Sequence, residues 1–161
     1  MHSIYLPAAC LLAFLAQTCF CIMGNFTIFE NFNNHVLSIS PIDGLLEIKP
    51  NATDRWFIES FGWSREYVVI RHRDSNRFIS FPRVAENATA ELSKNAATVL
   101  VISDPHPYDA LRYRISANQL YFTVEANSNT DPRRVLRLRS RVMDYTSLFA
   151  LLPEPLSLLR S

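Results

Sequence analysis

The segment Asn76-Arg-Phe-Ile-Ser-Phe81 decides the fold, because similar segments lie 42 residues before it and 42 residues after it. Its counterparts are Asn34-His-Val-Leu-Ser-Ile39 and Asn118-Gln-Leu-Tyr-Phe-Thr-Val124. Each copy opens with asparagine, which is common in turns, and continues with the β-branched and aromatic residues typical of strands. Self-similarity at such a period indicates repeated supersecondary units. The sequence therefore predicts three related units in one chain.

Each unit is predicted to contain four strands. Short apolar segments, many of them alternating with polar residues, are separated by clusters of Asn, Asp, Pro and Gly. No segment sustains apolar residues at helical spacing, although 84–97 is also compatible with a short helix. We predict an all-β domain of three approximate four-strand repeats, the third shifted by about one residue. The predicted strands are 26–30, 35–40, 45–49, 55–60, 65–72, 77–81, 89–92, 98–104, 110–116, 119–126, 134–140 and 147–153.

Residues 1–21 are predicted to be a cleaved signal peptide. The apolar run from Ile4 to Leu15 is typical of a signal-peptide core and is too short to span a bilayer. Cleavage is expected after Cys21 or as late as Gly24, and a buried N-terminal helix is the alternative. All three cysteines lie in this leader, so about 140 cysteine-free residues must be held by their core. We expect a secreted monomer without a membrane anchor, with one domain over 25–153 and a tail over 154–161.

The predicted core is built from apolar residues of all three repeats. It is expected to include Ile28, Leu37, Trp56, Ile70, Ile79, Ile115, Val124, Leu138 and Phe149. Trp63 stands apart, since its turn beside Gly62 would either expose it as an interface anchor or place it at the barrel floor.

The charged residues suggest one candidate binding surface. Net charge is +1, with 14 Arg and 2 Lys, so no strong overall field favours nucleic acid as a partner. Arg137, Arg139 and Arg141 share one face of a predicted strand, because side chains alternate along strands. These three residues are candidates for binding sulfate, phosphate or an acidic protein. The alternative is a solvated strand face that is partly paired with Asp144 and Glu125.

No motif for enzymatic chemistry is evident. His35, His72 and His106 lack metal-pair spacing, and the chain has neither a nucleophile elbow nor a glycine-rich phosphate loop. Composition alone leaves a Ser-His-Asp arrangement open. We predict a non-enzyme that requires neither cofactor nor metal.

Three Asn-x-Thr tripeptides predict N-glycosylation in an exported protein. They begin at Asn25, Asn51 and Asn87. Such tripeptides also occur by chance, and Asn25 lies close to the expected new N-terminus.

Short motifs at 24–28 (Gly-Asn-Phe-Thr-Ile), 56–59 (Trp-Phe-Ile-Glu), 97–104 and 148–154 (Leu-Phe-Ala-Leu-Leu-Pro-Glu) resemble the fungal ricin-B-like β-trefoils, above all the mushroom serine-protease-inhibitor family. The resemblance implies a β-trefoil fold. It covers nearly the whole chain after the leader. Lectins of this fold usually carry Gln-x-Trp in each repeat, whereas this chain has Asp54-Arg-Trp56 in the first repeat and no Trp in the others.

The resemblance implies a binding protein, and we favour a protease inhibitor that acts through a surface loop. A stiff exposed loop binds a protease cleft at low entropic cost. The candidate loop residues are Pro41, Ile42, Asp43, Arg65, Arg83 and Arg133, and proline beside Arg83 and Arg133 would stiffen two of the loops. The expected partner is an extracellular protease or another protein. A lectin-like glycan-binding protein and a secreted effector or receptor ligand that binds an anionic partner are the alternatives.

Overall fold

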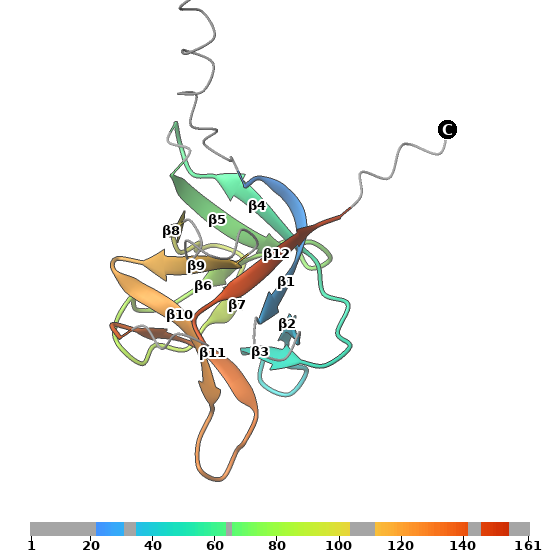
Figure 1. The fold of residues 1–161 in the computed structure, drawn as a ribbon, viewed down its shortest axis with the longest axis vertical. Coiled ribbons are helices and arrows are strands. Elements are labelled where there is room, and N and C mark those ends of the chain that lie inside the picture. Colours follow the sequence, from blue (N-terminus) through green and yellow to red (C-terminus); the bar gives the residue numbers. More distant parts are fainter. Residues whose placement is uncertain (1–21, 31–34, 64–65, 104–111, 142–145, 155–161) are drawn as a thin grey trace, which may run out of the picture.

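The computed structural model describes residues 22–30, 35–63, 66–103, 112–141 and 146–154. These residues form twelve strands and no helix, and so none that could cross a membrane. All twelve predicted strands are confirmed, and each of their ends agrees with the prediction to within two residues. The region 84–97, where a short helix had been possible, contains a turn and a strand. The strands are β1 (Gly24–Glu30), β2 (Val36–Ile39), β3 (Leu46–Lys49), β4 (Trp56–Ser60), β5 (Tyr67–His72), β6 (Arg77–Ser80), β7 (Glu91–Ser93), β8 (Leu100–Ser103), β9 (Arg112–Ala117), β10 (Leu120–Ala126), β11 (Arg134–Arg139) and β12 (Phe149–Pro153) (Figure 1).

Six of the strands close into a barrel. Antiparallel pairing runs from β1 to β4, β5, β8, β9 and β12, and β12 pairs with β1 to complete the ring. The remaining strands form three hairpins, β2–β3, β6–β7 and β10–β11, which extend from β1, β5 and β9. A six-stranded barrel with one hairpin in each of three repeats is a β-trefoil, so the predicted fold is confirmed.

The three hairpins join one another in a cap. Val135 of β11 pairs with Glu47 of β3, and a bridge from Leu45 to Glu91 joins the first hairpin to the second. A bridge from Thr89 to Arg137 joins the second hairpin to the third. The cap therefore holds its connecting loops against each other, which limits their independent motion.

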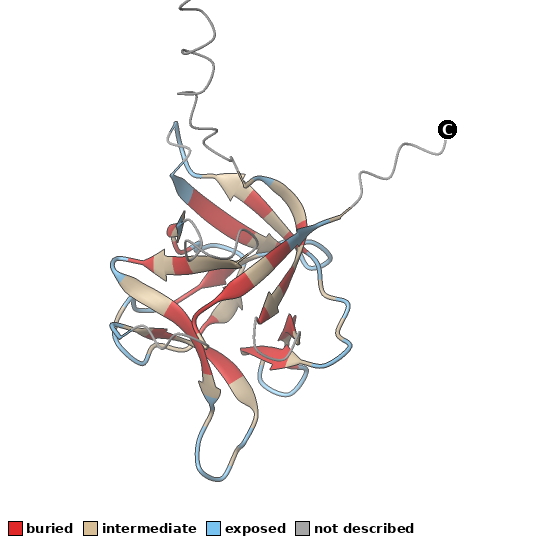
Figure 2. Ribbon diagram, viewed as in Figure 1, coloured by how far each residue is buried: buried red, intermediate tan, exposed pale blue. Residues whose placement is uncertain are grey.

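The core lies inside the barrel and beneath the cap. All nine residues predicted to form it are buried, and they come from all three repeats. Figure 2 shows buried residues alternating with partly exposed ones along the barrel strands, as expected for strands with one face inward. Trp56 is fully buried, and its indole Nε1 donates a hydrogen bond to the carbonyl of Leu37, at 3.0 Å.

Two of the three repeated asparagines mark left-handed turn positions, and the third, Asn34, lies outside the described residues. Asn76 and Asn118 have φ angles of 56° and 46°, immediately before or near the start of β6 and β10. Asparagine tolerates this conformation better than most residues, because its short side chain can hydrogen-bond locally. A chain with only three glycines can therefore make the turns that a trefoil requires.

One ion pair links the barrel to the cap. The carboxylate of Glu30, at the end of β1, is fully buried, and both of its oxygens accept hydrogen bonds from the guanidinium group of Arg134 in β11. A buried carboxylate is stable only when it is paired in this way.

Candidate functional site

The loops of the cap are the first candidate surface. Pro41, Ile42 and Asp43 form the turn between β2 and β3, and all three are exposed. The β10–β11 loop, residues 127–133, projects from the body at the bottom of Figure 1. These two loops and the β6–β7 connection, residues 81–90, occupy equivalent places in the three repeats.

Arg133 joins two of these loops. Its guanidinium group donates to Asp43 Oδ2 at 2.9 Å, to Ser40 Oγ at 2.9 Å and to Asp131 Oδ2 at 2.6 Å. The side chain is only 27% exposed. Arg133 was predicted to stand at a loop tip, but the structure places its charge inside a clamp between the β2–β3 and β10–β11 loops. It positions the loops, and Ile42 at the turn is 78% exposed.

The clamp lowers the pKa of both aspartates. The hydrogen bond from Arg133 is the main cause for each, and it lowers the pKa of Asp43 from 3.8 to about 2. A carboxylate whose pKa is lowered by folding stabilises the folded state above its unfolded pKa of about 4. That contribution is lost as the pH falls towards 2.

Replacing Arg133 with alanine should therefore return the pKa of Asp43 to about 4. The carboxyl carbon shift of Asp43, followed by NMR during acid titration, measures this directly. A wild-type Asp43 that titrates near 4 would contradict the clamp.

Arg83 is presented differently. Pro82, Arg83 and Val84 are exposed consecutive residues of the β6–β7 connection. Among the described residues, no hydrogen bond or ion pair engages the Arg83 guanidinium group. The loop is fixed on both sides of this tip: the N–H of Phe81 donates to Thr98 Oγ1 at 2.9 Å, and the N–H of Asn87 donates to the carbonyl of Leu138 at 2.9 Å.

The predicted anion-binding arginines have internal partners. Arg137 donates to the carbonyl of Asn127 at 2.9 Å and to that of Asn87 at 3.3 Å, so it bridges two cap loops. Both oxygens of Glu125 accept from Arg139, which raises the pKa of Arg139. Arg141 is exposed. Arg137 and Arg139 share one face of β11, as strand alternation predicts, whereas Arg141 lies beyond the end of this strand, and two of the three charges are used to hold the cap together. Arg65 lies outside the described residues.

The glycosylation candidates differ in exposure. Asn51 and Asn87 are exposed turn residues with φ angles of 56° and 67°. Asn25 is half-buried in β1, where it pairs with Phe57. The amide oxygen of Asn87 accepts a hydrogen bond from Arg139, which leaves its nitrogen available for a glycan.

Sequence reasoning did not identify a chain of polar side chains below the β5–β6 turn. Asp54 Oδ1 lies 3.2 Å from His72 Nε2, and His72 Nδ1 lies 2.9 Å from Ser75 Oγ. Ser75 also donates its main-chain N–H to Nδ1, at 3.2 Å. The single lone pair of Nδ1 is thus shared with a fixed backbone donor, which makes it a poor general base.

The buried His72 ring also packs against Trp56, with the ring centroids 5.2 Å apart. We assign this network to holding the turn. No cluster of three or more metal-ligating side chains occurs within the described part of the chain.

An aromatic tip ends the β4–β5 hairpin. Trp63 is fully exposed, so it does not close the barrel floor. Phe61 and Tyr67 are also exposed and lie opposite each other, because the N–H of Phe61 donates to the carbonyl of Tyr67 at 2.7 Å. Exposed aromatic residues of this kind anchor many protein interfaces.

Comparison with known proteins identifies the fold. No protein-family model matches the chain, and no curated protein sequence matches it. Solved structures do match: a ricin B-like lectin from Macrolepiota procera in complex with lactose has a TM-score of 0.67 at 12% identity, over 81% of this chain and 95% of that one. The Rhizoctonia solani agglutinin has a TM-score of 0.64 at 14% identity, over 95% and 100%. A proteinase inhibitor from Coprinopsis cinerea has a TM-score of 0.58 at 11% identity, over 82% and 98%. The resemblance to ricin-B-like trefoils is confirmed at the level of the fold.

Proposed function

We propose that this chain is a secreted binding protein that inhibits a trypsin-like protease through the β6–β7 loop. Arg83 would enter the specificity pocket of the protease. The observation that carries the proposal is the exposed sequence Pro82-Arg83-Val84 on a loop that is hydrogen-bonded to the body on both sides. The proteinase inhibitor among the structural neighbours supports this choice, whereas the lectins among them support carbohydrate binding.

The loop suits inhibition because little of it must become ordered on binding. Pro82 restricts the backbone beside Arg83, and Ala88 accepts a hydrogen bond from the N–H of Leu138 at 2.9 Å. The N–H of Ser140 donates to Glu86 Oε2 at 2.6 Å. A loop held in one conformation loses less entropy in the complex, and it is also harder for the protease to cleave and release.

Replacing Arg83 with alanine should weaken inhibition of trypsin by at least about 30-fold, the effect of losing a hot-spot side chain. Arg83→Lys should retain inhibition, since trypsin-like enzymes accept both basic residues. Arg77→Ala is the matched control, because Arg77 is exposed one strand away and lies outside the loop. The inhibition constants of the four proteins, measured with a chromogenic substrate, provide the test.

Two outcomes would contradict the proposal. One is the absence of inhibition by micromolar wild-type protein across a panel of serine proteases. The other is an unchanged inhibition constant for Arg83→Ala, which would move the site to another loop or to the aromatic tip.

Export and glycosylation are part of this proposal. A secreted inhibitor would lose residues 1–21, and Asn51 and Asn87 are the exposed acceptors. Intact-mass measurement of protein secreted by a eukaryotic host, before and after removal of N-glycans, tests both points. An N-terminus at Met1 or an unchanged mass would contradict them.

A further inference from the structure

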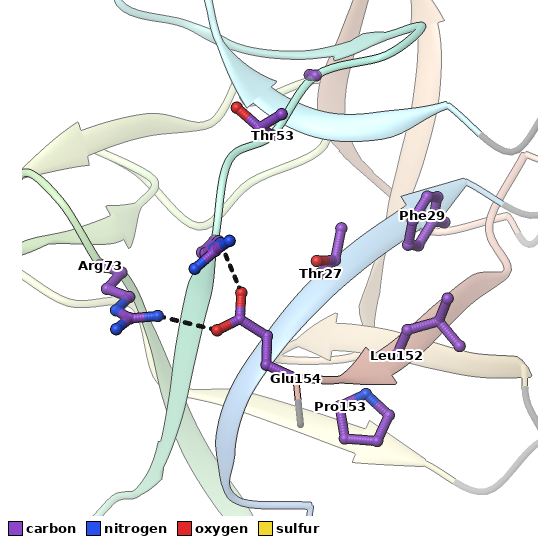
Figure 3. Close-up of a pocket in the computed structure, with 9 residues that line it drawn as sticks. Thr27, Phe29, Thr53, Arg73, Leu152, Pro153 and Glu154 are labelled. Carbon is purple, nitrogen blue, oxygen red and sulfur yellow. Dashed lines mark hydrogen bonds and ion pairs between the residues drawn. The ribbon is translucent and has the colours of Figure 1, made fainter. Parts of the chain in front are cut away.

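A hollow lined by both polar and apolar residues lies at the seam where β1 and β12 meet. It has a volume of about 560 Å³. Figure 3 shows its lining, to which β1 contributes Thr27 and Phe29, and the end of β12 contributes Leu152 and Pro153. The β3–β4 loop adds Thr53 and Arg55, the β5–β6 turn adds Arg73, and Glu154 follows β12. The proposed inhibitory loop contributes no residue to it.

Two arginines in the hollow hold one carboxylate. Arg55 Nε lies 2.8 Å from Glu154 Oε1, and Arg73 Nη1 lies 2.9 Å from Glu154 Oε2. Each guanidinium group thus contacts a different oxygen of the same carboxylate, as the dashed lines in Figure 3 show. The side chains of Arg55 and Arg73 are 52% and 46% exposed, whereas that of Glu154 is 15% exposed.

The two arginines have hydrogen-bond donors that Glu154 does not use. A guanidinium group carries five N–H donors, and each arginine directs only one nitrogen to Glu154. Two positive charges face one negative charge, so the cluster keeps an excess of one positive charge. The two arginines are about half exposed, so water competes for their guanidinium groups and these ion pairs contribute little to stability, although Glu154 itself is mostly buried. The Glu154 side chain can therefore be exchanged for another carboxylate at small cost.

We propose that this hollow binds the carboxylate of an acidic sugar and that Glu154 occupies the place of that carboxylate in the free protein. The arginine pair supplies charge-assisted hydrogen bonds of the geometry that Glu154 already shows. The hydroxyl groups of Thr27 and Thr53 can bond to sugar hydroxyls, and Leu152, which is exposed, offers an apolar wall to the C–H face of the ring. This site is independent of protease inhibition.

The test is isothermal titration calorimetry of the wild-type protein with digalacturonic acid, N-acetylneuraminic acid, lactose and sodium acetate. Binding of at least one acidic sugar, weakened by added salt, is expected, with no measurable heat from lactose or acetate. The uronic and sialic acids distinguish the two sources of a sugar carboxylate.

The variants have opposite expected effects. Glu154→Gln removes the competing carboxylate and should strengthen binding about threefold to tenfold. Arg55→Ala and Arg73→Ala should each weaken it about tenfold or more. Arg77→Ala, an exposed arginine outside the hollow, should bind as the wild type does. A thermal melt confirms that each variant is folded, and Arg55→Lys, which keeps the charge without the planar fork, replaces Arg55→Ala if that variant unfolds.

Three results would overturn the proposal. These are equal binding of lactose and the acidic sugars, an affinity that Glu154→Gln leaves unchanged or lowers, and a loss in Arg77→Ala as large as that in Arg55→Ala. The last would indicate a general charge effect instead of a site. None of these results bears on inhibition by the Arg83 loop, which is measured separately.

Discussion

Arg134→Ala is expected to lower the free energy of unfolding by about 3–5 kcal/mol, because it leaves the carboxylate of Glu30 buried without its partner. Glu30 is fully buried, and Arg134 binds both of its oxygens. Water cannot readily replace the lost donors, since the end of β1 that carries Glu30 is flanked by β12 and β2. Urea denaturation at neutral pH, monitored by circular dichroism, measures the change.

A double variant separates the pair's own contribution from the cost of an unpaired charge. Glu30→Leu combined with Arg134→Met should recover most of the lost stability, because apolar residues of similar size often replace a buried ion pair without loss. Arg77→Ala is again the control and should lie within about 0.5 kcal/mol of the wild type. A loss below about 1 kcal/mol for Arg134→Ala would show that the environment of Glu30 compensates for the missing charge.

Trp56→Ala should cost about 3–5 kcal/mol, the typical effect of removing a large aromatic residue from a core. Trp56 is fully buried at the start of β4, and its ring contacts both the core and His72. The expected loss is a large share of the stability of an ordinary domain, so this variant should unfold at a clearly lower urea concentration than the wild type.

Trp56→Phe divides this effect into its parts. Phenylalanine keeps most of the apolar surface but leaves the carbonyl of Leu37 without the indole donor, which should cost about 1–3 kcal/mol. The same urea titrations give both values. If Trp56→Phe were as damaging as Trp56→Ala, the lost hydrogen bond and not the packing volume would account for the loss, because phenylalanine keeps most of that volume.

The fold was largely predictable because its signals are local. Alternation places Ile28, Ile70 and Ile115 inward on strands of the three repeats, and the structure buries all three. The 42-residue spacing of Asn76 and Asn118 reflects a backbone conformation that recurs with the repeat. Both kinds of signal depend on neighbours in sequence, which a single chain displays directly.

The candidate sites were predicted less well, because their chemistry depends on distant partners. Strand alternation correctly placed Arg137 and Arg139 together, and pairing of this face with Glu125 was weighed as the alternative, but the sequence could not show that Asn127 engages Arg137. Arg133 meets Asp43 across 90 residues of sequence, and Arg73 meets Glu154 across 81. The exposed arginines could be distinguished from the paired ones only after the repeats had been folded onto each other.

The two tryptophans lie in opposite environments, and this gives the protein two natural fluorescent probes. Trp56 is fully enclosed, whereas Trp63 is fully exposed on the aromatic tip. Emission from Trp56 should be blue-shifted and protected from iodide, and emission from Trp63 should be red-shifted and readily quenched. Quenching can therefore report what approaches the hairpin, while the blue component reports independently whether the barrel is intact.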